Sequence, residues 1–140
     1  RIEQGLKESQ SIVEIAQGIK DIAKVSAGRA MTIARTEVLT ANSIGEAEAM
    51  KDASELIPNL VKVWINANDE RVRGNPGGLY PDSEADHWRL MGEIVSYGDK
   101  FSNGLAAPRD PSGPAGETIN CRCSTLAVSE DDLGRLGLKR

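Results

Sequence analysis

Aromatic residues are scarce in this sequence, whose 140 residues include only two Trp, two Tyr and one Phe. Aliphatic residues and alanine must therefore supply most of the hydrophobic core. No apolar run approaches the roughly 18 residues that a membrane-spanning helix needs, and the N-terminus lacks the basic and then apolar layout of a signal peptide. We therefore expect a soluble chain without membrane contact.

Positive charge is not in excess either, because 17 Lys and Arg face 21 Asp and Glu, which gives a net charge of -4. This balance argues against a domain that clamps nucleic acid over its whole surface, and it leaves a local basic patch open. The length fits one domain. Because the first residue is Arg, we expect an excerpt or processed product of a larger protein.

Apolar residues recur at helical spacing in the first third of the chain. One stripe is made of Ile12, Ile15, Ile19 and Ile22. Ser11 followed by Glu14 fits a capping box at the start of this helix. A second stripe, rich in small residues, begins near Ala30 and continues until Pro58 forbids a helix. Gly45 is a weak point within it, and we predict one long helix.

Alternation of apolar and polar residues then indicates β-structure. Three strands are predicted, over residues 60–67, 93–97 and 118–128. The first should be half-buried, with Val61 and Val63 on one face and Lys62 and Trp64 on the other. We therefore predict an α+β domain in which two N-terminal helices, the second one long, pack on a small and mainly antiparallel sheet with long loops.

The segments between the strands carry turn signals. Pro81 indicates the start of a short helix that runs to Met91 and ends at a left-handed Gly92. Residues 104–116 contain three prolines and are expected to form a long loop.

Cys121 and Cys123 are the only cysteines, and they are too close in sequence for an ordinary disulfide. On a strand they would point to the same face and could direct two thiolates toward one metal ion. His87, the only histidine, would be a third ligand of a structural zinc, with Asp86, Glu117 or a partner chain as the fourth. The alternative, which a single chelating pair favours, is that both cysteines are small buried residues.

The other polar motifs do not indicate catalysis. A nucleophilic Cys and His pair has little support, because nothing in the sequence orients the two. Arg71 and Arg73 precede a glycine-rich stretch and could bind phosphate, but their spacing matches no P-loop. Pairing of these arginines with Asp69 and Glu70 on a solvated turn is the simpler interpretation. Arg29 and Arg35 with Glu37 are likewise expected to form a surface or interhelix pair rather than a catalytic one.

Several short motifs follow one another along residues 27–128. They are Ala34, Arg35, Thr36 and Glu37, then Trp64, then Arg71 and Arg73, then His87, and finally Asn120, Cys121, Arg122 and Cys123. In this order they resemble the phage Mu F-like head morphogenesis domain. The resemblance divides the chain into a leading helix (1–26), a family core (27–128) and a polar tail (129–140). It implies that the arginine turn, the histidine and the cysteines converge on one polar or metal-linked centre.

The resemblance implies a minor head protein of a tailed bacteriophage or prophage, acting in capsid assembly at or near the portal, with no established enzymatic reaction. Portal, coat or scaffold proteins are then its partners, in the virion head or the host cytoplasm. The first helix and the leucines of the tail are expected to contact them. Apart from a structural zinc, no cofactor is expected.

Two alternatives belong to other functional classes. One is a phage-associated effector enzyme, either a nuclease or an ADP-ribosyltransferase-like protein, for which His87, Arg71 and Arg73 are the candidate residues. The other is a DNA-binding morphogenesis factor, which net charge does not indicate and whose binding would depend steeply on salt.

Overall fold

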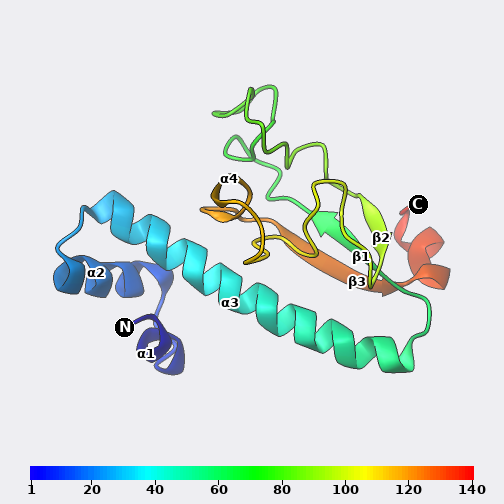
Figure 1. The fold of residues 1–140 in the computed structure, drawn as a ribbon, viewed down its shortest axis with the longest axis horizontal. Helices are drawn as coiled ribbons and strands as arrows, with labels where there is room; N and C mark the ends of the chain where they lie inside the picture. Colours follow the sequence, from blue (N-terminus) through cyan, green and yellow to red (C-terminus); the bar gives the residue numbers. More distant parts are fainter.

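A long helix runs alongside a small sheet in the computed structural model, which describes residues 1–140 (Figure 1). The elements are α1 (Ile2–Lys7), α2 (Ile12–Ala23), α3 (Ala27–Leu56), β1 (Leu60–Ile65), β2 (Ile94–Ser96), α4 (Ala115–Thr118), β3 (Ser124–Ser129) and the 3-10 helix η1 (Glu130–Leu136). This arrangement confirms the predicted α+β class, with helices at the N-terminus followed by an antiparallel sheet. None of the helices has the length and apolarity that crossing a membrane would require.

Helix α2 begins at the predicted capping box. The Ser11 hydroxyl accepts a hydrogen bond from the Glu14 amide, and the Glu14 carboxylate accepts one from the Ser11 amide at 2.7 Å. The buried face of α2 packs against the first turns of α3. This N-terminal core consists of Ile15, Ala16, Ile19, Ala30 and Ala34. Ile22, which the sequence pattern placed on the same face, is instead 71% exposed, since the buried stripe ends with Ile19.

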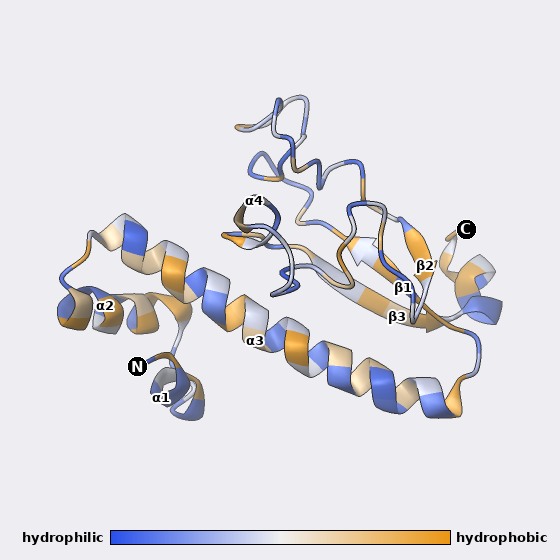
Figure 2. Ribbon diagram, viewed as in Figure 1, coloured by the Kyte–Doolittle hydropathy of each residue, from blue (hydrophilic) through white to orange (hydrophobic).

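Helix α3 is continuous through Gly45 and stops two residues before Pro58, as predicted. Its fully buried residues are few and small apart from Met50: they are Ala30, Ala34, Ser43 and Met50. Polar residues alternate with apolar ones along its exposed length (Figure 2). Tertiary contacts therefore hold α3 mainly at a narrow stripe of small residues, which allow neighbouring backbone to come close.

The sheet has the order β2-β1-β3, and both pairings are antiparallel. Val63 of β1 lies opposite Ile94 of β2 and Leu126 of β3. Strand β1 is central, with a partner at each edge, and its residues from Leu60 to Trp64 are all buried, so side chains on both of its faces are covered. The prediction that this strand is only half-buried was therefore wrong.

A second core lies where the loops of the C-terminal half pack on β1. It consists of Trp64, Leu90, Phe101, Leu105, Cys121 and Cys123. The Trp64 and Phe101 rings meet edge to face, with centroids 5.1 Å apart. Only Trp64 belongs to a strand, so this core depends on loops being held in place by other interactions.

One predicted helix and several predicted strand ends were wrong; β1, for example, stops at Ile65 rather than at residue 67. Residues 81–91 form turns rather than a short helix, because the Trp88 amide donates to the Arg73 carbonyl in a neighbouring loop instead of to its own segment. Gly92 does adopt the left-handed conformation, with φ of 79°. The last strand begins at Ser124 rather than at 118, since β1 ends at Ile65, whose partner is Ser124. Earlier residues have no strand to pair with, and both cysteines therefore precede β3.

Candidate functional site

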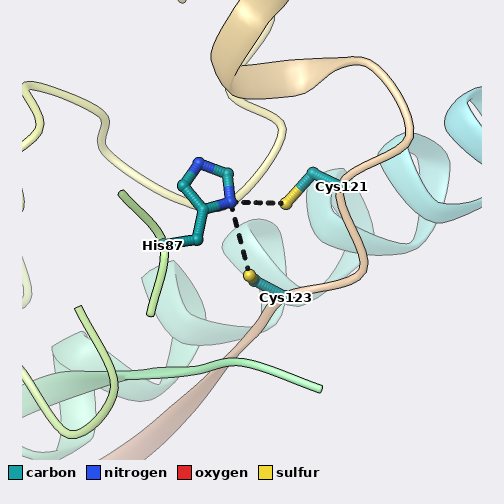
Figure 3. Close-up of side chains that lie close together, drawn as sticks. All are labelled: His87, Cys121 and Cys123. Atoms are coloured by element: carbon teal, nitrogen blue, oxygen red, sulfur yellow. Dashed lines mark hydrogen bonds between the residues drawn. The ribbon is translucent and has the colours of Figure 1, made fainter. Parts of the chain in front are cut away.

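His87, Cys121 and Cys123 meet in the interior of the C-terminal half. Figure 3 shows one imidazole nitrogen facing both sulfur atoms, and each Sγ lies 3.6 Å from His87 Nδ1. All three residues are buried, with His87 only 2% exposed. The three donor atoms lie within 4.8 Å of one another. The structure thus brings together residues that are 34 and 36 positions apart in the sequence.

The opposite side of the imidazole is held by a carboxylate. His87 Nε2 lies 2.7 Å from Glu117 Oε2, and the same oxygen accepts a hydrogen bond from the Asn103 side chain at 3.1 Å. Since a carboxylate only accepts, Nε2 carries the proton and Nδ1 presents its lone pair to the sulfurs when the ring is neutral. Asn66 fixes the backbone of the same residue by donating to the His87 carbonyl at 3.2 Å. The edge of the Trp64 ring packs against the imidazole, with centroids 5.4 Å apart.

Arg109 fixes the backbone of both cysteines. Its guanidinium donates to the Cys121 carbonyl at 3.1 Å and also to the Cys123 carbonyl and the Ser43 hydroxyl of α3. The residue is 2% exposed and adopts a left-handed φ of 61°. No sequence pattern singles out Arg109. The only signal was its place between two prolines, which by itself does not show where the side chain goes.

The electrostatics of the trio favour one thiolate. The hydrogen bond from Cys123 lowers the pKa of Cys121, and the nearby imidazole contributes in the same direction. The same hydrogen bond and burial raise the pKa of Cys123. Burial lowers the pKa of His87, but the interactions with Cys121 and Glu117 outweigh burial and raise it. Cys121 is therefore the more readily ionised of the two thiols.

Helix α3 holds the segment that carries the cysteines. Arg35 donates to the Asn120 side chain at 3.0 Å, and the Thr36 hydroxyl accepts from the Asn120 amide at 2.9 Å. Asn120 has a left-handed φ of 57°, which turns the chain toward Cys121. The expected pairing of Arg35 with Glu37 was wrong, because Arg35 reaches across to the loop and Glu37 is exposed.

The remaining arginines of the motif tie loops together. Arg122 pairs with Asp69, and the Arg73 guanidinium donates to the Ile119 carbonyl. The expected local pairing of Arg71 and Arg73 with Asp69 was therefore wrong for the side chains, although the Arg71 amide does donate to Asp69 at 2.9 Å. These contacts join residues that are 46 and 53 positions apart. Pairing of charges between sequence neighbours therefore does not predict them.

A cavity of about 720 Å³ adjoins the trio. Its lining includes His87, Cys121, Cys123, Arg71, Arg73 and Tyr80. The structure thus gathers the arginine turn, the histidine and the cysteines around one space. Glu37 of the motif does not line it. Chemically, the lining offers two sulfur donors, one nitrogen donor and guanidinium groups.

A family model and two relatives match this chain in comparisons with known proteins. A model of the family described as phage Mu protein F like protein matches residues 1–126. The NAD(+)--arginine ADP-ribosyltransferase EFV of Enterococcus faecalis is 31% identical over 126 residues, which are 89% of this chain and 24% of that protein. The uncharacterized protein YqbB of Bacillus subtilis is 27% identical over 138 residues, which are 95% of this chain and 41% of that protein. This chain thus spans less than half of either relative, and no solved structure matches it significantly.

Proposed function

The chain belongs to the phage Mu protein F-like family, and on this basis we propose that it is a structural and interaction module of a phage or prophage minor head protein. The module acts during capsid assembly, at or near the portal, and catalyses no reaction. The match over residues 1–126 is the observation that carries this proposal, because it covers both the N-terminal helices and the motif that holds the loops.

The hydrogen bonds made by the arginine side chains support a structural role. Arg73 and Arg109 donate to backbone carbonyls, and Arg35 holds Asn120 against α3. Each of these contacts joins segments distant in sequence, and each occupies donors that a catalytic arginine would need for its substrate. A domain with long loops and few strands gains a fixed shape in this way, which suits a protein whose task is attachment.

Exposed apolar side chains on α2 support contact with other head proteins. Val13 is 64% exposed and Ile22 is 71% exposed, although the opposite face of α2 is buried in the N-terminal core. Leu136 of η1 is also exposed, whereas Leu133 on the same helix packs inside the domain. We propose that α2 and η1 contact portal, coat or scaffold proteins.

Site-specific cross-linking in assembling procapsids tests this function. A photoreactive residue at position 13 or 22 of the full-length phage protein should capture portal, coat or scaffold protein. The same photoreactive residue placed at the exposed position 48 of α3 serves as the control and should capture less of these head proteins. Exclusive capture of host proteins from either α2 position would contradict the proposal.

The ADP-ribosyltransferase name of one relative motivates a test for the enzymatic alternative. That name describes a whole protein of which this chain spans 24%. The purified 140-residue chain should hydrolyse no NAD, transfer no ADP-ribose to arginine and cut no nucleic acid. Turnover that disappears in His87→Ala but persists in a control variant of the exposed Glu84, Glu84→Gln, would favour the enzyme and contradict the structural role.

A further inference from the structure

In its neutral form, the His87 imidazole can accept a hydrogen bond from only one of the two neighbouring thiols. Its Nε2 hydrogen is directed at Glu117, so Nδ1 has one lone pair for two sulfurs that both lie 3.6 Å away. A single lone pair lies in the ring plane and accepts one well-directed hydrogen bond. One cation placed between the three atoms would instead use the lone pair and both thiolates together.

The distances from the two sulfurs to the nitrogen match the spacing of zinc ligands. With Zn–S near 2.3 Å and Zn–N near 2.0 Å, tetrahedral angles put a sulfur and a nitrogen ligand about 3.5 Å apart. Both observed distances from Sγ to Nδ1 are 3.6 Å. Two thiolates and an imidazole are also the donor types that zinc takes in proteins, in preference to the oxygen ligands of magnesium or calcium.

The groups behind the donors are arranged as in metal sites. Glu117 accepts from the far nitrogen of the imidazole, which fixes the tautomer that a metal ligand needs and makes the ring a stronger donor. Asn103 in turn holds the Glu117 carboxylate. Arg109 holds the carbonyls of Cys121 and Cys123, so that both sulfurs face the same point. These contacts fix the donors before any ion binds.

We propose that His87 Nδ1, Cys121 Sγ and Cys123 Sγ bind one Zn²⁺ whose fourth ligand is exchangeable. The two carboxylates considered for that position are engaged elsewhere, since Glu117 contacts Nε2 on the far side of the ring and Asp86 accepts from the Arg89 amide at 2.9 Å. All three ligands line the cavity of about 720 Å³, which admits water or an anion. Arg71 and Arg73 on the same cavity favour an anionic ligand over a cationic one.

Metal analysis of the 140-residue chain, purified without chelators, tests the proposal directly. We expect one equivalent of zinc per chain by elemental mass spectrometry. Replacement of zinc by Co²⁺ should give the sulfur-to-cobalt charge-transfer absorption and the visible bands of a tetrahedral site. Azide, added as a small anionic probe, should alter the visible bands if the fourth position is exchangeable, and an unaltered spectrum would contradict that part.

Variants separate ligands from supporting groups. Cys121→Ser, Cys123→Ser and His87→Gln should each lose stoichiometric zinc. Glu117→Gln keeps all three ligands and should bind zinc about 10- to 100-fold more weakly, as expected for loss of a carboxylate behind a ligand histidine. Glu84→Gln is the matched control, because Glu84 is exposed and does not line the cavity, and it should bind zinc like the unmodified chain.

The unmodified chain also provides the decisive negative result, which does not depend on whether a variant folds. A folded chain that takes up neither Zn²⁺ nor Co²⁺, and whose thermal stability is unchanged by either ion, would overturn the proposal. This outcome would leave the cross-linking result with phage head proteins unaffected, so the metal site and the proposed function fail independently.

Discussion

At the scale of single residues, the site depends on side chains that hold other residues in place. Arg109 is the clearest example, because one buried guanidinium joins α3 to both cysteine carbonyls. Hydrogen bonds from charged groups contribute about 1.5–3 kcal/mol each, and a carbonyl left unpaired inside the protein loses its solvation as well. Such a residue is therefore costly to replace.

Arg109→Met should lower the free energy of unfolding by about 3 kcal/mol, since the methionine fills the space but leaves two buried carbonyls without donors. Urea unfolding followed by circular dichroism measures the change. The control is Arg135→Met, whose side chain is 83% exposed and should alter stability by less than about 0.5 kcal/mol. Equal effects of the two substitutions would contradict the clamping role of Arg109.

Asp110 gives a prediction for acid pH. Burial alone would raise the pKa of its carboxyl, but hydrogen bonds from Ser112 and from the Ala106 amide outweigh burial and hold that pKa below its usual value. The folded state therefore resists protonation more than the unfolded state. This contribution to stability is complete above the unfolded pKa and is lost as the pH falls through the folded pKa.

Urea unfolding between about pH 6 and about pH 2 should therefore show a loss of stability at the acid end that is smaller in Asp110→Asn. The variant should be the less stable protein at neutral pH, where the carboxylate is charged and accepts from Ser112 and Ala106. Parallel pH profiles for the two proteins would show that this carboxyl does not contribute.

At the scale of elements, α3 combines a tightly packed end with a long exposed middle. Ala34 is fully buried where α2 crosses, whereas Ala49 lies on the exposed side further along the same helix. Gly45 has no atoms near the position that a Cβ would occupy. The same type of substitution should therefore have different effects at different positions of α3.

Ala34→Leu should destabilise the protein by about 1–3 kcal/mol, because three added carbon atoms have no space between α2 and α3. Ala49→Leu adds the same atoms on the exposed face and should change stability by less than about 0.5 kcal/mol. Thermal unfolding of both variants measures the difference. A neutral Ala34→Leu would mean that the two helices are not in close contact.

Gly45→Ala should raise the free energy of unfolding by about 0.5–1 kcal/mol, since alanine is the better helix former and meets no neighbouring atom. Gly92→Ala is the matched comparison. Gly92 also has open space around it, but its φ of 79° strains any residue with a Cβ, so this substitution should destabilise. Urea unfolding of the two variants should give opposite signs, and a shared sign would contradict this account.

At the scale of the whole molecule, the buried apolar residues form two small and separate cores. The N-terminal core is formed by α2 and the start of α3, and the second core is formed by β1 and the loops that carry the proposed zinc ligands. Because these cores share no residue, local opening of one need not open the other. Metal removal should therefore act on one half of the molecule.

Hydrogen exchange with and without a chelator tests this division in the zinc-loaded chain. Backbone amides between residues 85 and 123 should exchange faster after chelation, because the loops lose the ion that joins them. Amides of α2 and of the first turns of α3 should keep their protection, which serves as the internal control. A uniform increase over the whole chain would show that the two cores unfold together.

Local patterns in the sequence were sufficient for the elements with local causes. The capping box at Ser11 and Glu14, the uninterrupted helix before Pro58 and the left-handed Gly92 each depend on neighbouring residues, and all three are present in the structure. The half-buried strand and the helix over residues 81–91 were wrong for the opposite reason. Coverage of β1 on both faces and the Trp88 to Arg73 hydrogen bond come from distant segments.

By itself, the sequence determined the fold class, the start and length of the main helices and the set of residues that resemble the phage Mu protein F-like family. Only the tertiary structure decided that His87 meets Cys121 and Cys123, that Glu117 supports the imidazole instead of completing a ligand set, and that Arg109 matters at all. The physical reason is the sequence separation over which each kind of interaction acts. Capping and helix periodicity act over a few residues, whereas the side-chain contacts of the site join positions from 12 to 85 residues apart, and only the packed loops bring those positions within bonding distance.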